Sequence, residues 1–198
     1  SKGEGLGNQF LSNIRETDAI IHVLRCFEND NIVHVEGSVD PIRDKEIIDI
    51  ELQLKDLETL EKRVEKINRA ARTGDKEAQK VQEVMQRIKE GLEAAQNVRQ
   101  LDLSLKEREE IVNELQLLTD KPVLYVCNVS ESDAVGGNPL VDKVQTLARK
   151  ENAELLTLAV SIEADINELE SFEERQLFLD DLGLEEAGSA KLIRKAYE

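Results

Sequence analysis

Polar side chains follow two apolar stretches of the sequence, at the points where strands are predicted to end. Residues 123–127 are apolar and are followed by Asn128 and Glu131, and the strand-like, mostly apolar stretch 153–160 is followed by Ser161. The carboxyl ends of parallel strands open onto the crevice where α/β sheets bind ligands, so these three side chains are expected to meet there. That geometry suits a nucleotide base. An ordinary polar turn after each strand remains the alternative.

A glycine-rich segment near the start of the chain is a second candidate for ligand binding. Gly3, Gly5 and Gly7 have the spacing of a phosphate-cradling loop, but no apolar strand precedes them in these 198 residues. A dinucleotide fingerprint needs a strand, a loop and a helix in that order, so we interpret the segment as a flexible lead into a helix. The sequence contains no G-x-x-x-x-G-K-[ST] motif, so no P-loop is predicted within it.

Metal chemistry and catalysis find no support in the residue pattern. His22 and His34 are the two histidines, and neither has neighbours at metal-ligand spacing. We interpret His22 as a core residue and His34 as a surface residue. Cys26 and Cys127 each lie within an apolar run and are predicted to be buried and reduced. The sequence therefore predicts no metal site and no catalytic residue in this chain.

Charge and hydropathy limit the partners that the chain could have. Asp and Glu number 42 against 26 Lys and Arg, which gives a formal net charge of −16. Such a charge opposes binding to a phosphate backbone, so no direct nucleic-acid binding is expected from this acidic segment. No apolar run approaches the roughly 20 residues that a membrane span needs. With reduced cysteines and no signal-like N-terminus, the prediction is a cytoplasmic chain without membrane contact.

The strand and helix patterns predict an α/β fold. Residues 18–27, 122–127 and 153–160 are strand-like, and residues 140–150 form a helical pattern between the last two strands. A strand, helix and strand joined by short connections is the building block of an open parallel sheet. Within strand 18–27, the stretch 19–24 is almost continuously apolar, as is typical of a strand covered on both faces. Short helices are expected over 8–17, 163–170, 173–182 and 189–197.

The stretch from residue 42 to 118 interrupts this alternation with long helical patterns. Apolar residues recur at spacings of three and four on both sides of a turn at 73–75, which predicts two antiparallel helices over 42–98 in a coiled-coil hairpin. Ser104 and Glu107 have the form of a capping box that starts a third helix through residue 118. The predicted seam of the hairpin consists of Ile50, Leu54, Leu57, Met85, Ile88 and Leu92.

Several runs of this sequence resemble the YchF/Obg-like ATPase family of translation-factor-class P-loop NTPases. They are Gly-Glu-Gly-Leu-Gly-Asn-Gln-Phe at 3–10, Arg-Cys-Phe at 25–27, Asn-Val-Ser-Glu at 128–131, Glu-Ala-Asp-Ile at 163–166 and Leu-Gly-Leu at 182–184. The resemblance implies a P-loop NTPase sheet interrupted by a coiled-coil hairpin. It divides the chain into a first sheet part (1–41), the inserted helical domain (42–118) and a second sheet part (119–198).

The same resemblance implies that the chain is an internal fragment. Family members carry a Walker A loop upstream of the segment that starts here and a TGS domain downstream of the segment that ends here. Gly3, Gly5 and Gly7 would then belong to the distal part of a switch segment. ATP and Mg²⁺ would be cofactors of the full-length protein, whereas this chain alone is expected to bind neither tightly. The ribosome or its subunits would be the macromolecular partner.

The residues at 128–131 differ from the guanine-binding pattern Asn-Lys-x-Asp in two ways. Val129 replaces the lysine stem that packs on the base, and Glu131 is one methylene longer than aspartate. An unpaired polar group in such a site costs about 1–3 kcal/mol, which is enough to change a base preference. The resemblance accordingly implies ATP over GTP, with Asn128 and Val129 at the adenine.

Two functions therefore follow from the sequence. The first is a fragment of a ribosome-associated NTPase that binds and hydrolyses ATP, in which this chain supplies the base-recognition half and is inactive alone. The second is a non-catalytic module whose helical hairpin binds a protein partner, with the α/β part as its scaffold.

Overall fold

The fold was analysed in a computed structural model, which describes residues 10–29, 37–71 and 75–196. The chain divides into two units. The helical unit contains residues 1–20 and 46–122, and the sheet unit contains residues 21–45 and 123–198. Residues 10–20 thus group with the helical unit and residues 37–45 with the sheet unit. The sequence-based division into 1–41, 42–118 and 119–198 stays a prediction.

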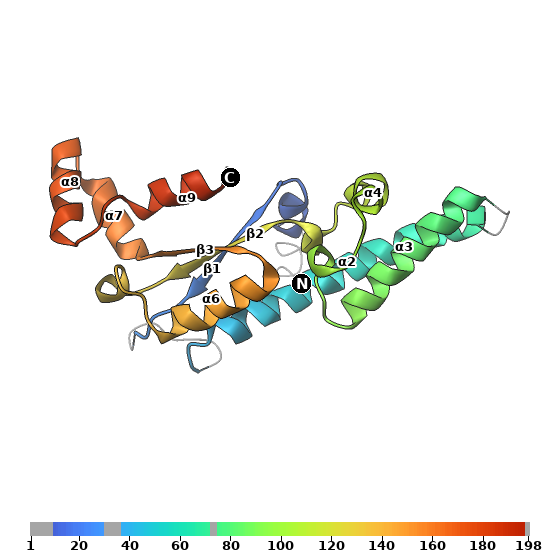
Figure 1. Ribbon diagram of the computed structural model, residues 1–198, viewed down its shortest axis with the longest axis horizontal. Helices are drawn as coiled ribbons and strands as arrows, with labels where there is room; N and C mark the ends of the chain where they lie inside the picture. The colour runs from blue at the N-terminus through green and yellow to red at the C-terminus, as the bar shows by residue number, and fades with distance from the viewer. Residues whose placement is uncertain (1–9, 30–36, 72–74, 197–198) are drawn as a thin grey trace. The chain divides into compact units, whose positions relative to one another are not determined.

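The sheet confirms the predicted α/β fold. Its strands are β1 (Ile20–Arg25), β2 (Val123–Asn128) and β3 (Glu154–Leu158), in the order β1-β2-β3 (Figure 1). β2 and β3 pair in parallel, with Tyr125 opposite Leu155. The Cys26 amide donates to the Asn128 carbonyl at 2.7 Å, and the Ile20 amide donates to the Pro122 carbonyl at 2.9 Å. This constant offset makes β1 parallel to β2 as well.

Side chains of β2 alternate between two apolar clusters, one on each face of the sheet. Tyr125 and Cys127 join the larger cluster, to which α6 (Pro139–Glu151), α7 (Val160–Glu168) and α8 (Phe172–Asp181) contribute. Leu124 and Val126 face the other side, where Leu192 of α9 (Gly188–Ala196) packs. The helix between β2 and β3 is the one predicted from residues 140–150.

The expectation that β1 is covered on both faces is wrong for this strand. Leu24 and Cys26 are buried in the larger cluster, but Ile21 is 46% exposed and Val23 is 56% exposed. The opposite face of the sheet is covered by α9, whose Leu192 packs against side chains of β2 and β3. Within the described residues nothing covers the corresponding face of β1, which an apolar sequence alone cannot reveal.

The helical unit contains the predicted hairpin. Helix α2 (Pro41–Ala71) is followed by α3 (Lys76–Glu93), whose first amides are capped by the Asp75 side chain, and α3 folds back along α2 (Figure 1). A hydrogen bond of 2.8 Å from Gln82 to Asn68 joins the two helices. Propensity makes each helix marginal by itself, so the buried seam between them stabilises both.

The predicted seam is correct for α3 and partly wrong for α2. Met85, Ile88 and Leu92 are buried, as expected, whereas Ile50 is 51% exposed and Leu54 is 55% exposed. Leu60 is fully buried in their place. The buried face of the first half of α2 is largely polar, so the apolar periodicity in this half of the helix marks an exposed stripe.

Short helices and turns follow the hairpin. They are η1 (Val98–Gln100), α4 (Leu105–Glu107), η2 (Arg108–Val112), α5 (Asn113–Leu115) and η3 (Leu118–Asp120), and in the sheet unit η4 (Glu131–Asp133). The predicted capping box is present, since the Ser104 amide donates to the Glu107 carboxylate at 2.7 Å. The predicted third helix ends at Leu115 rather than residue 118, because Gln116 adopts a left-handed conformation with φ 48°.

Buried polar side chains of α2 join the hairpin to these short turns. The Asn97 amide group accepts a hydrogen bond from Gln53 at 2.8 Å and donates one to Asp49 at 2.9 Å. Asp56, which is fully buried, accepts from the amides of Leu118 and Thr119 at 2.8 and 2.7 Å. Burial raises the pKa of Asp56 more than these hydrogen bonds and the nearby Arg15 guanidinium lower it.

Candidate functional site

The carboxyl ends of the strands enclose a hollow of about 600 Å³, which we call the strand-end hollow. It brings together the four residues that the sequence singled out for base recognition: Asn128, Val129, Glu131 and Ser161. The remaining lining residues are Phe27, Glu28, Asn29, Ser130 and Ser132. The hollow thus draws on the segment after β1, the segment after β2 and the first turn of α7. Its volume accommodates a planar heterocycle of the size of a purine.

Asn128 is held rigidly at the end of β2. Its side-chain oxygen accepts a hydrogen bond of 3.0 Å from the Val160 amide at the start of α7, and its carbonyl accepts one from the Cys26 amide. The amide nitrogen of the side chain has no hydrogen-bond partner among the described residues. This group is a donor, so it suits an acceptor nitrogen on the edge of a purine.

Val129 lies at the hollow, but its side chain is turned into the core. It is only 3% exposed and belongs to the larger apolar cluster of the sheet unit. The Val129 amide donates to the Leu158 carbonyl at 3.0 Å, which continues the β2–β3 hydrogen bonding beyond the end of the strand. Any contact of Val129 with a base would therefore come mainly from its backbone.

The other two predicted residues are accessible. Glu131 and Ser161 are both exposed, Glu131 at the start of η4 and Ser161 in the first turn of α7. The hydroxyls of Ser130, directly before η4, and Ser132, within η4, are hydrogen-bonded to each other at 3.0 Å. The Glu131 carboxylate forms no hydrogen bond with the described residues. It can therefore bind a ligand without first breaking one.

Phe27 is a site residue that the analysis of spacing did not identify. The Arg25 guanidinium lies over its ring, 4.8 Å from the ring centre, and the Arg25 side chain also donates to the Phe27 carbonyl at 3.0 Å. A half-buried aromatic ring fixed in this way offers a stacking surface to a flat ligand. The sequence contained a hint, because Phe27 is the last residue of the predicted strand 18–27 and so falls at the same edge of the sheet as Asn128.

Asn138 is a second residue that was missed, and it shapes the hollow without lining it. Its side-chain oxygen caps α6 by accepting from the amides of Leu140 and Val141. Its amide nitrogen donates to the Cys26 carbonyl at 2.7 Å and to the Asp133 carboxylate at 2.8 Å. One side chain therefore fixes the start of α6 to the segment after β1 and to η4. A helix cap before proline was visible in the sequence, but these two contacts were not.

The remaining sequence candidates lie elsewhere. Gly3, Gly5 and Gly7 fall outside the described residues. Cys26 and Cys127 are buried and free, as predicted, and a hydrogen bond between the two thiols lowers the pKa of Cys26 and raises that of Cys127. Among residues 10–29, 37–71 and 75–196, no group of three or more His, Cys, Asp or Glu side chains is arranged to hold a metal ion. No helix in those ranges is long and apolar enough to cross a membrane.

Comparisons with known proteins give a consistent result, although no family model matches the chain. The chain is 47% identical over 199 residues to the ribosome-binding ATPase YchF of Bacillus subtilis and 48% identical over 198 residues to that of Escherichia coli O157:H7. Each alignment covers the whole of this chain and 54% of the relative. The chain therefore spans about half the length of the curated relatives it matches.

A solved structure agrees with the sequences. The YchF GTPase of Schizosaccharomyces pombe matches with a TM-score of 0.83 and 34% identity, covering 96% of this chain and 52% of that protein. The similarity extends through the parallel sheet and the inserted helices. Sequence and fold together confirm that the chain resembles, along its whole length, the YchF/Obg-like ATPase family of P-loop NTPases.

Proposed function

We propose that the chain is the base-recognition part of a ribosome-associated NTPase that binds and hydrolyses ATP in preference to GTP. The observation that carries the proposal is the strand-end hollow, which Asn128 lines together with Phe27 and Glu131 and where the Asn128 side-chain nitrogen has no hydrogen-bond partner among the described residues. The relatives support it by name, as ribosome-binding ATPases, while the fission yeast structure is named a GTPase. Nucleotide preference is therefore the sharpest point to test.

In the proposed complex, the chain's own residues bind and orient the base. The Asn128 amide donates to a ring nitrogen, the Phe27 ring stacks on the base, and Glu131 lies near the edge that differs between adenine and guanine. A carboxylate accepts well from guanine, whose N1–H and amino group are donors, and is repelled by the N1 lone pair of adenine. The greater length and exposure of Glu131 keep its carboxylate from the paired geometry that guanine requires. ATP would bring phosphates and Mg²⁺, which supply the phosphoryl-transfer chemistry.

Replacing Glu131 with Asp tests this assignment in a longer protein that restores the segments present in the relatives but outside these 198 residues. Competition between ATP and GTP for a fluorescent nucleotide measures the affinity ratio. Glu131→Asp should shift the ratio toward GTP by about threefold to tenfold, since a hydrogen bond to a charged acceptor contributes about 1.5–3 kcal/mol when well formed. Glu168→Asp is the matched control, because Glu168 is exposed at the end of α7 and does not line the hollow.

The double replacement Val129→Lys with Glu131→Asp rebuilds the full guanine pattern. Because Val129 is 3% exposed, the lysine stem must leave the core before it can reach the base, so a loss of stability is expected alongside a shift of at least about tenfold toward GTP. An unchanged ratio in both folded variants would assign the preference to backbone contacts and remove residues 128–131 as its determinant.

The second candidate function is a non-catalytic protein-binding module. One observation favours it: Ile47, Ile50 and Leu54 form an apolar stripe on α2 and are 47%, 51% and 55% exposed. Sedimentation of the 198-residue chain with ribosomes, without nucleotide, separates the two functions. Co-sedimentation that is lost in an Ile50→Glu, Leu54→Glu variant would support the module, whereas no co-sedimentation of the folded chain would favour the nucleotide-dependent function. A cytoplasmic location is part of both proposals.

A further inference from the structure

The buried face of the first half of α2 is held by hydrogen bonds within the helical unit. Asp49 and Gln53 both bond to the Asn97 side chain, and the Asp56 carboxylate accepts from two amides of η3. All of these α2 side chains are buried. Buried polar groups that have partners are part of a stable core. This half of α2 is therefore attached to the helical unit largely by its polar residues.

The apolar residues of the same half of α2 lie on its exposed face. Ile47, Ile50 and Leu54 are each roughly half exposed, and we call these three residues the α2 stripe. Because they are three and four residues apart, they adjoin one another along two turns of the helix. A single apolar residue at a surface needs no explanation, but a contiguous row outside a largely polar buried face does. The α2 stripe is therefore a candidate interaction surface.

Glutamates border the α2 stripe on both sides. An α-helix turns by about 100° per residue, so Glu46 lies about 40° beyond Ile50 around the helix. On the other side, Glu51 lies about 40° beyond Ile47. Both glutamates are exposed, and neither forms an ion pair with the described residues. The apolar row thus runs between two unpaired negative charges.

This arrangement has the pattern of one helix of a coiled coil. The α2 stripe occupies positions a, d and a of a heptad repeat, which are the positions that pack against a partner helix. Charges at positions e and g select that partner, and here Glu46 is at g and Glu51 at e. Glu58, at the next e position, is already paired with Lys55 at 3.0 Å. The first two glutamates therefore determine which charge a partner helix must carry.

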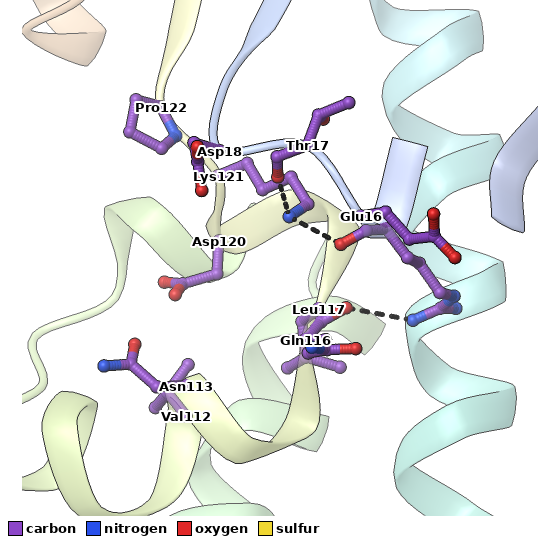
Figure 2. Close-up of a pocket in the computed structure, with 11 residues that line it drawn as sticks. Glu16, Thr17, Asp18, Val112, Asn113, Gln116, Leu117, Asp120, Lys121 and Pro122 are labelled. Carbon is purple, nitrogen blue, oxygen red and sulfur yellow. Dashed lines mark hydrogen bonds between the residues drawn. The ribbon is translucent and has the colours of Figure 1, made fainter. Parts of the chain in front are cut away.

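A hollow in the helical unit is less suited to binding a partner. It has a volume of about 340 Å³ and is lined by residues on both sides of Lys121 and by residues 15–18 (Figure 2). Its cations are already engaged, because Lys121 donates to the carbonyls of Arg15 and Thr17 and the Arg15 guanidinium donates to the Gln116 carbonyl at 3.1 Å (Figure 2). A ligand would have to displace these hydrogen bonds, whereas a helix could bind the α2 stripe without displacing any.

Charge complementarity separates the possible occupants of the α2 stripe. A second copy of the chain would bring its own Glu46 and Glu51 to the interface, and like charges at positions e and g disfavour pairing. A nucleic acid would bring phosphates to the same glutamates, on a chain whose net charge is −16. A helix with lysine or arginine at its own e and g positions instead gains ion pairs with both glutamates.

We propose that the α2 stripe binds a basic amphipathic helix of a partner protein, whose apolar side chains cover Ile47, Ile50 and Leu54 and whose cations pair with Glu46 and Glu51. The inference goes beyond base recognition in the sheet unit and does not depend on it. It gives the chemistry of the protein partner that the second candidate function requires.

Two synthetic peptides of three heptads each test the inference by fluorescence anisotropy, at physiological salt and without nucleotide. Both peptides have leucine at a and d and alanine at b, c and f, and they differ only in having lysine or glutamate at e and g. The lysine peptide should bind the 198-residue chain at least about tenfold more tightly than the glutamate peptide does.

Replacing one residue of the α2 stripe tests the apolar part of the contact. Leu54→Gln should weaken binding of the lysine peptide by at least about fivefold, because a central apolar side chain of an interface carries much of its binding energy. Leu177→Gln is the matched control, since Leu177 is an exposed leucine of α8, and should change the affinity by less than about twofold. Circular dichroism verifies that both variants are folded.

Reversing the bordering charges tests the choice of partner. Glu46→Lys combined with Glu51→Lys should make the chain prefer the glutamate peptide. Glu109→Lys combined with Glu173→Lys changes the net charge equally at exposed positions of η2 and α8, and this control should still prefer the lysine peptide.

The remaining outcomes would overturn the inference. Equal binding of the two peptides would exclude selection by charge, and equal effects of Leu54→Gln and Leu177→Gln would exclude the α2 stripe as the contact. Displacement of the peptide by a short RNA duplex would assign the stripe to nucleic acid. A dimer of the chain that Leu54→Gln dissociates would assign it to a second copy. Binding to the 198-residue chain but not to the longer protein would assign it to a segment of that protein.

Discussion

The two units of the molecule bury different kinds of side chain. Among the described residues, the helical unit buries Asp49, Gln53, Asp56, Asn97 and Thr119, whereas Lys45 is the buried polar residue of the sheet unit. The reason lies in the backbone. Sheet strands satisfy one another's amides and carbonyls, but η1 and η3 leave amides that need side-chain acceptors. Asp56 accepts from two amides of η3, and the Thr119 hydroxyl accepts from the Val98 amide at 3.2 Å. Irregular backbone thus requires polar side chains in the core.

The sharpest way to test the buried face of α2 is to place a charge on it. Leu60→Asp should destabilise the chain by about 3–5 kcal/mol or unfold the helical unit, since Leu60 is fully buried in the hairpin core. Leu54→Asp is the control, because Leu54 is 55% exposed, and should change the free energy of unfolding by less than about 1 kcal/mol. Urea unfolding followed by circular dichroism measures both. Equal losses would mean that the assigned face of α2 is wrong.

Two hydrogen bonds between side-chain amides have the same length, but one is buried and the other is exposed. Comparing them shows how much burial of such a bond changes the free energy of unfolding. Asn97→Ala leaves Gln53 and Asp49 without their shared partner and should cost about 2–4 kcal/mol of unfolding free energy. Asn68→Ala removes the exposed hydrogen bond between Asn68 and Gln82, also 2.8 Å long, and should cost less than about 0.5 kcal/mol. Similar costs for the two variants, measured by thermal and urea unfolding, would contradict the role assigned to the buried polar set.

In the sheet unit, close packing rather than polar pairing should be the sensitive feature. A Cβ at Gly188 would lie 2.8 Å from both Leu158 Cβ and the Glu163 carboxylate, which accepts from the Gly188 amide. Gly188→Ala should therefore cost about 1–3 kcal/mol through displacement of α9. Gly136→Ala, where nothing lies within 4 Å, should be close to neutral. A tolerated Gly188→Ala, with an unchanged melting temperature, would show that α9 is loosely attached.

The smallest expected effect is a pH dependence of the helical unit. Burial raises the pKa of Asp56, so the folded state binds its proton more tightly than the unfolded state does. The contribution of Asp56 to stability is therefore fully present below its unfolded pKa and falls as the pH rises toward the folded value. The decline cannot exceed about 1.4 kcal/mol per pH unit. Urea midpoints between pH 4 and 7 should fall with pH relative to Asp56→Asn. A relative rise would show that hydrogen bonding outweighs burial.

Periodicity and motif spacing predicted the elements better than their surroundings. The three strands, the hairpin and the capping box at Ser104 depend on local pattern, and all are present. Which face of α2 is buried depends on η1 and η3, whose positions no local pattern fixes. As a result, Leu54 is exposed and Asp56 is buried, which is the reverse of what the chemistry of their side chains suggests. Similarly, glutamine is not a residue type that favours the left-handed conformation, so the sequence did not predict that α5 ends at Gln116.

At the candidate site, sequence reasoning found positions but not orientations. Asn128, Glu131 and Ser161 follow strand ends, and topology alone brings them to one hollow. That the Val129 side chain points into the core follows from the alternation of β2 continuing past its last residue, which spacing did not resolve. The ring of Phe27 became a candidate only through the position of Arg25.

Helix α2 has a consequence for how this segment can be divided. The boundaries between the units fall within β1 at residues 20 and 21, within α2 at residues 45 and 46, and directly before β2 at residues 122 and 123. Domains are usually joined by exposed linkers that proteases cut and that gene fusions exploit. Here, excision of either unit would cut through a helix or a strand, so neither unit is expected to fold when it is expressed as a separate fragment.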